Sequence, residues 1–80
     1  MAEIVEMVFS LEGIKRLLDR FGEKEVALSF AGERLVKIFG VNLIETFIGK
    51  KRIRFVFSKN ENWNKMMDFL KKVGVKFVAR

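Results

Sequence analysis

Residues 50–58, Lys-Lys-Arg-Ile-Arg-Phe-Val-Phe-Ser, place a large apolar side chain at every second position after two lysines. In a β-strand, Ile53, Phe55 and Phe57 would point to one side and the residues between them to the other. One side is then apolar, while the other begins with two arginines. Such a strand fits a sheet that is covered on one face and open to solvent on the other.

Two segments have the helical spacing needed to cover such a sheet. The first lies between Ser10, a favourable N-cap, and Gly22, a favourable C-terminal residue. Its apolar stripe is Leu11, Ile14, Leu17, Leu18 and Phe21. The second follows the capping box formed by residues 58–61 (Ser-Lys-Asn-Glu) and ends at Gly74. Its stripe is Trp63, Met66, Met67, Leu70 and Val73. We therefore predict two amphipathic helices.

The remaining segments favour β-strands. Residues 3–9 alternate as a strand does. Residues 25–39 form two further strands around Gly32, and residues 42–57 form two around Gly49, because glycine between alternating segments is typical of hairpin turns.

The resulting element order is β-α-β-β-β-β-α, with a possible last strand in residues 75–80. It predicts an α+β fold, in which an antiparallel sheet of about five strands carries two helices on one face. Residues 1–80 form a single domain. Residues 33–39 could also form a helical turn, although their β-branched content favours a strand. If 33–39 or 42–48 is not a strand, a ferredoxin-like sheet is the alternative.

This arrangement predicts which residues lie on each face of the sheet. The helix-covered face would carry Val5, Met7, Phe9, Val26, Leu28, Phe30, Leu43, Phe47, Ile53, Phe55 and Phe57. The uncovered face would carry Glu6, Val8, Ala27, Ser29, Ala31, Thr46, Arg52, Arg54 and Val56.

Composition restricts the chemistry. The chain has no His and no Cys, which removes the commonest general base, the best nucleophile, disulfides and thiolate metal sites. We expect no enzymatic activity, no metal and no cofactor. The absence of Cys suits a reducing cytoplasm, no stretch resembles a signal peptide or a membrane span, and the Lys- and Glu-rich composition is typical of hyperthermophile proteins.

The net charge of +6 attracts polyanions, and four cations lie within five positions: Lys50, Lys51, Arg52 and Arg54. Arginine contacts phosphates and stacks on bases. We therefore predict a non-catalytic nucleic-acid-binding module, with DNA or RNA as the ligand, that binds through the open sheet face carrying Arg52 and Arg54 and through the turn cations Lys50 and Lys51. The alternative is a self-associating structural or scaffold domain without nucleic-acid binding, because exposed apolar residues and free strand edges favour pairing.

The stretch FIGKKRIRFVFS (47–58), followed by a capped, Lys-rich helix, resembles part of one repeat of the TATA-box-binding protein family. The element order β-α-β4-α resembles that repeat as well. The resemblance implies an uncovered concave sheet as a platform for nucleic acid, and two copies side by side as a homodimer. The chain has no proline, so the family's Phe-Pro-Gly stretch is absent, and no individual DNA-contact residue carries over.

Overall fold

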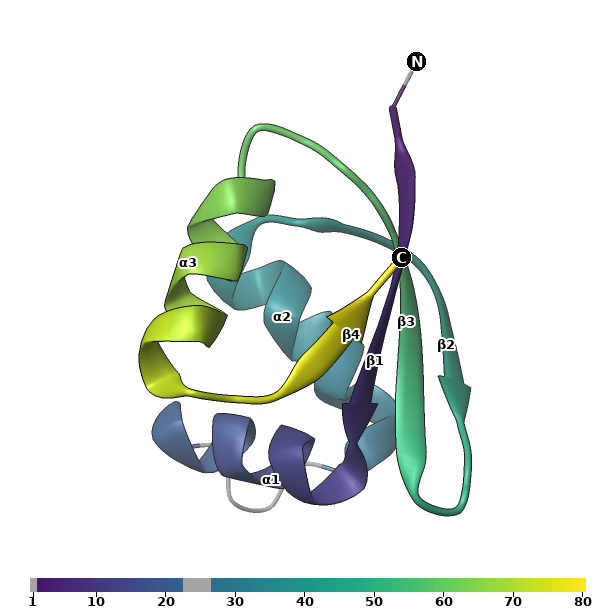
Figure 1. The fold of residues 1–80 in the computed structure, drawn as a ribbon, viewed down its shortest axis with the longest axis vertical. Coiled ribbons are helices and arrows are strands. Elements are labelled where there is room, and N and C mark those ends of the chain that lie inside the picture. The colour runs from purple at the N-terminus through teal and green to yellow at the C-terminus, as the bar shows by residue number, and fades with distance from the viewer. Residues whose placement is uncertain (1, 23–26) are drawn as a thin grey trace.

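The computed structural model describes residues 2–22 and 27–80 (Figure 1). The elements in chain order are β1 (Ile4–Ser10), α1 (Leu11–Arg20), the short 3-10 helix η1 (Leu28–Phe30), α2 (Ala31–Phe39), β2 (Asn42–Ile48), β3 (Arg52–Ser58), α3 (Trp63–Val73) and β4 (Phe77–Ala79).

The strands form one antiparallel sheet in the order β2-β3-β1-β4. The strands β1 and β3 lie at the centre, and each of the two helical connections passes over one strand to reach the next. This is the split β-α-β arrangement called ferredoxin-like, the alternative that the sequence allows. The expected α+β class with an antiparallel sheet is confirmed, but the described residues form four strands and three α-helices instead of about five strands and two helices.

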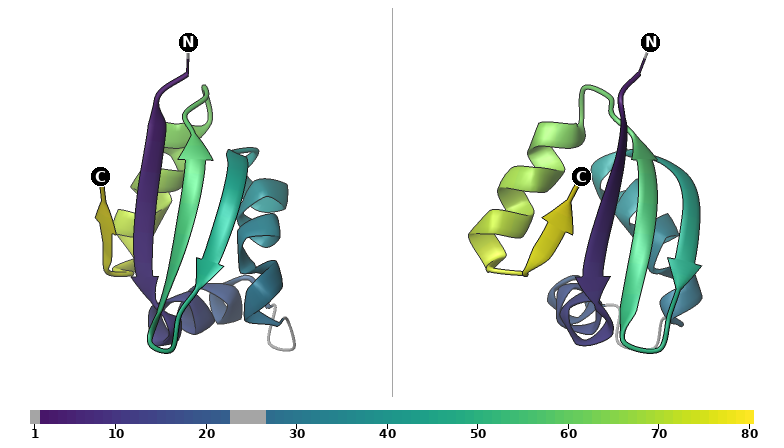
Figure 2. Two further views of the ribbon diagram at one scale, coloured as in Figure 1. Left: turned by 90° about the vertical axis from the view of Figure 1, so that its right-hand side faces the viewer. Right: turned by 45° about the vertical axis from the view of Figure 1, so that its right-hand side comes forward.

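All three α-helices lie on the same side of the sheet, and Figure 2 shows the opposite face uncovered by any described helix. Between the two layers lies the core, in which Met7, Ile53 and Phe55 are completely buried. Aromatic rings pack against one another within it; for example, the rings of Phe57 and Trp63 meet edge to face with their centroids 5.4 Å apart. The expected placement of the helices on one face is therefore seen.

The two strands expected around Gly32 are wrong. Residues 31–39 form α2, in which Ala31, Leu35 and Phe39 follow one another at intervals of four and are all buried. A Cβ on Gly32 would lie 2.7 Å from Leu43 Cδ2 and 3.0 Å from Phe55 Cε1, so glycine lets the helix pack closely on the sheet. Burial of this helical stripe outweighs the weak strand preference of the β-branched residues.

The segment before α2 also differs from expectation. Leu28 is half-buried in η1, and Phe30, expected in the core, is 53% exposed. Phe30 is exposed because it precedes the first turn of α2 and does not lie in a strand. The expected core position of Val26 lies outside the described residues.

The helix caps follow the sequence in one case and not in the other. Ser10 Oγ accepts a hydrogen bond of 2.9 Å from the Gly13 N–H, as its N-cap position predicts. Ser58, in contrast, is the last residue of β3 and pairs with Ile4 of β1. Because the sheet extends this far, α3 begins only at Trp63, and the predicted capping box does not form.

Candidate nucleic-acid interface

The central strand β3 has the two-sided character that its sequence predicts. Ile53, Phe55 and Phe57 are fully buried beneath the helices. Arg52, Arg54 and Val56 alternate with them and lie on the uncovered side. We call this side of the sheet the open face; its residues include Ile4, Glu6 and Val8 of β1, Glu45 and Phe47 of β2, Arg52, Arg54 and Val56 of β3, and Val78 and Arg80 at β4.

Phe47 lies on the open face and not in the core, which corrects the expectation from sequence. The pairing of β2 with β3 shifts between Leu43 and Glu45, so that Leu43 pairs with the buried Phe57 whereas Phe47 pairs with Arg54. Such a bulge adds one residue to a strand and reverses which residues face the core. For the same reason Thr46, expected on the open face, pairs with the buried Phe55.

Arg54 is held between two neighbours on the open face. Its guanidinium carbon lies 4.2 Å from the centroid of the Phe47 ring, within the range of a cation–π interaction. Its Nη1 donates a hydrogen bond of 3.4 Å to Glu6 Oε1. The side chains of Arg54 and Glu6 are 42% and 37% exposed, so solvent partly screens the pair, which contributes modestly to stability and orients the guanidinium.

Sequence reasoning missed Arg80, which the structure adds to the open face. The backbones of Glu6 and Arg80 exchange two hydrogen bonds, of 3.1 Å and 2.9 Å, which continue the pairing of β1 with β4. Strand alternation then places Arg80 on the same side as Val78. The segment Lys-Phe-Val-Ala-Arg at residues 76–80 shows this alternation and could have indicated the position.

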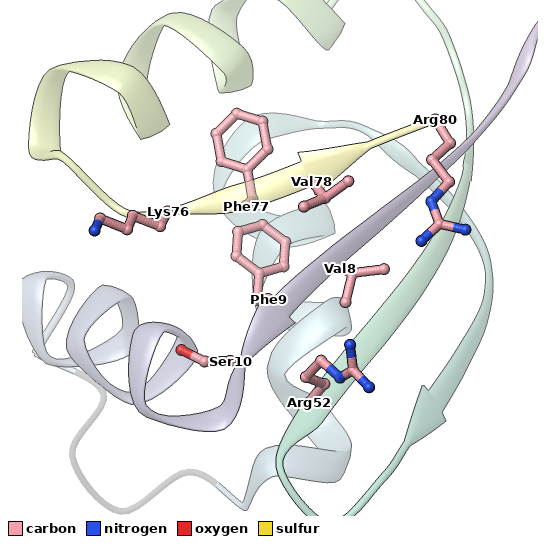
Figure 3. Close-up of a pocket in the computed structure, with 8 residues that line it drawn as sticks. All are labelled: Val8, Phe9, Ser10, Arg52, Lys76, Phe77, Val78 and Arg80. Carbon is pink, nitrogen blue, oxygen red and sulfur yellow. The ribbon is translucent and has the colours of Figure 1, made fainter.

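Two shallow grooves lie on the open face and share Val8, Arg52 and Arg80. The first, of about 350 Å³, is also lined by Lys76, Phe77 and Val78 (Figure 3). The second, of about 280 Å³, is lined instead by Glu6, Phe47, Gly49 and Arg54. The open face therefore combines guanidinium groups with an apolar surface.

The four predicted site residues do not all lie on one surface. Arg52 and Arg54 lie on the open face, whereas Lys50 and Lys51 are exposed in the turn between β2 and β3. This turn is closed by a hydrogen bond of 2.8 Å from the Gly49 N–H to the Arg52 carbonyl. The lysines thus extend the positive charge of the open face past the end of the hairpin.

Residues 2–22 and 27–80 provide neither a metal-binding cluster nor a membrane-spanning helix. No group of three or more His, Cys, Asp or Glu residues there could hold a metal ion. None of the helices described is long and apolar enough to cross a bilayer.

Comparisons with protein-family models, curated proteins and solved structures return no match to this chain. The resemblance to a TATA-box-binding protein repeat therefore stays a prediction.

Proposed function

We propose that this protein binds nucleic acid through the open face. The observation that carries the proposal is that Arg52, Arg54 and Arg80 share the one side of the sheet that no described helix covers. Guanidinium groups bind phosphates through pairs of N–H donors, and a positively charged chain attracts a polyanion over a distance. No catalytic step is part of the proposal.

Binding of this kind is dominated by phosphate contacts and therefore weakens as salt concentration rises. The apolar residues between the arginines would contribute contacts with sugars and bases. The turn residues Lys50 and Lys51 are exposed point charges. They would contact phosphates of the nucleic acid where it extends beyond the edge of the open face.

The test is a double charge reversal, Arg52→Glu with Arg54→Glu, measured by retention on immobilised DNA and RNA at low salt. The matched control is Arg16→Glu with Lys65→Glu, since these residues are exposed on α1 and α3 and the change in net charge is the same. We expect the open-face variant to lose on the order of tenfold in affinity for each phosphate contact removed. The control should bind nearly as the wild type does. Absence of wild-type retention on both DNA and RNA would contradict the proposal.

A second candidate function, self-association, is favoured by the edge strand β2. In the described sheet β2 is paired on one side only, and Ile44 and Ile48 are 54% and 49% exposed. A free edge with exposed apolar side chains invites pairing with a second copy. Two copies joined at β2 would place two open faces side by side, which is the arrangement that the resemblance to the TATA-box-binding protein family implies.

A further inference from the structure

We infer that Arg52 and Arg80 together hold one phosphodiester of a single-stranded nucleic acid, above an apolar floor made by Val8 and Val78. This inference rests on the proposed function and names its ligand class. The three arginines on the open face differ in their surroundings.

Arg54 is already engaged by Glu6 and Phe47. Arg52 and Arg80, in contrast, have no ion-pair partner among the residues that the structure describes. They are therefore the two guanidinium groups on this face that are available to an anion without breaking an existing ion pair.

The fold places these two arginines on either side of one strand. Arg52 belongs to β3 and pairs with Ser10, whereas Arg80 follows β4 and pairs with Glu6, so the two lie on opposite sides of β1 and diagonally across Val8. Figure 3 shows both guanidinium groups directed into the groove, above and below Val8. Like charges that line one apolar groove repel, and an anion between them reduces this repulsion. A phosphodiester, which offers two oxygens to two forked donors, has the matching chemistry.

The floor of the groove favours a single strand over a duplex. Val78 is 55% exposed, and the half-buried Val8 and Phe77 adjoin it. A duplex presents its charged backbone to a broad surface and keeps its bases paired inside. An unpaired strand instead can lay a base or a sugar on apolar side chains while a neighbouring phosphate contacts the arginines.

Removing the charge of Glu6 should raise the affinity of the protein for a single-stranded nucleic acid. Its carboxylate lines the second groove and faces Arg54, so it repels a phosphate chain that follows the open face. The substitution Glu6→Gln removes this repulsion and frees Arg54. A gain in affinity cannot arise from partial unfolding, which makes this variant a useful companion to loss-of-charge variants.

The experiment measures fluorescence anisotropy of a labelled oligothymidylate of about ten nucleotides, within the size range of single-strand sites, and of a mixed-sequence duplex of the same length. We expect the wild type to bind the single strand more tightly than the duplex. Arg52→Gln and Arg80→Gln should each weaken single-strand binding about tenfold. Because both arginines contact the same phosphodiester, each substitution should lower the salt slope by at most about 0.7, the value for one phosphate contact. Arg16→Gln, a matched loss of one exposed charge on α1, should change neither, and Glu6→Gln should bind several-fold more tightly.

Two results would overturn the inference while the proposed function stands. One is that the duplex binds as tightly as the single strand or more tightly. The other is that single-strand binding persists while Arg52→Gln and Arg80→Gln behave as Arg16→Gln does. If the wild type binds neither oligonucleotide at low salt, the proposed function itself is wrong.

Discussion

Phe47 and Arg54 illustrate how a single pair of side chains shapes the open face. The ring is 40% exposed, and the guanidinium lies over it. The aromatic ring therefore positions a charge instead of filling the core. Replacing Phe47 should therefore reduce the free energy of unfolding by less than replacing a phenylalanine on the covered side of the same sheet.

We expect Phe47→Ala to lower the free energy of unfolding by about 1 kcal/mol, the value typical of an exposed cation–π contact. A phenylalanine in the core would cost about 3–5 kcal/mol on the same substitution. Phe55→Ala is the control, because Phe55 is completely buried in the adjacent strand. Chemical denaturation measures both variants, and equal losses would show that Phe47 is packed inside.

Single residues on β3 could be assigned from sequence, whereas Phe47 could not. Arg52 and Arg54 lie where strict alternation places them, because β3 is central and regular. The assignment of Phe47 was wrong because a bulge in β2 shifts the alternation by one residue. Asn42–Ile48 contains no glycine or proline that would indicate a bulge from sequence. Arg80 was recoverable from the alternation of its short strand.

At the scale of elements, α2 shows where local propensity misleads. Its segment contains Val36 and Ile38, which favour strands, and Gly32 near its start resembles the glycine of a hairpin turn. In the structure Gly32 packs against the sheet, and Gly40 ends the helix with a φ of 74°. The buried spacing of four residues, from Ala31 to Leu35 to Phe39, is the pattern that indicates the helix.

Self-association through the edge strand β2 can be tested by placing charges on that edge. If two copies pair through this edge, lysine at the exposed Ile44 and Ile48 should prevent it, since charges on an edge strand discourage further pairing. We expect light scattering at high protein concentration to give a dimer mass for the wild type and a monomer mass for Ile44→Lys with Ile48→Lys.

The control for the edge variant is Lys at Phe30, which is similarly exposed but lies outside the sheet. A wild type that stays monomeric at high concentration would contradict self-association. Loss of the dimer in the Phe30→Lys protein as well would show that the contact is not made by β2.

At the scale of the whole molecule, the fold separates two surfaces. The apolar stripes of α1, α2 and α3 pack against one side of the sheet, and the charged residues of these helices lie in solvent. The other side of the sheet stays open and gathers arginines from β3 and from the residue after β4. The covered layer and the open face could be anticipated from the alternation in β3 and the apolar stripes of α1 and α3, but the number of strands could not, since it depends on how α2 packs.

The most direct test of the open face as the binding surface is a nuclear magnetic resonance titration of the labelled protein with a single-stranded oligonucleotide at low salt. We expect the largest shifts at backbone amides of Glu6, Val8, Arg52, Arg54 and Val78. The exposed lysines on α3, Lys65, Lys71 and Lys72, should keep their resonances unchanged. Shifts concentrated on α3, with β1 and β3 unaffected, would contradict the account.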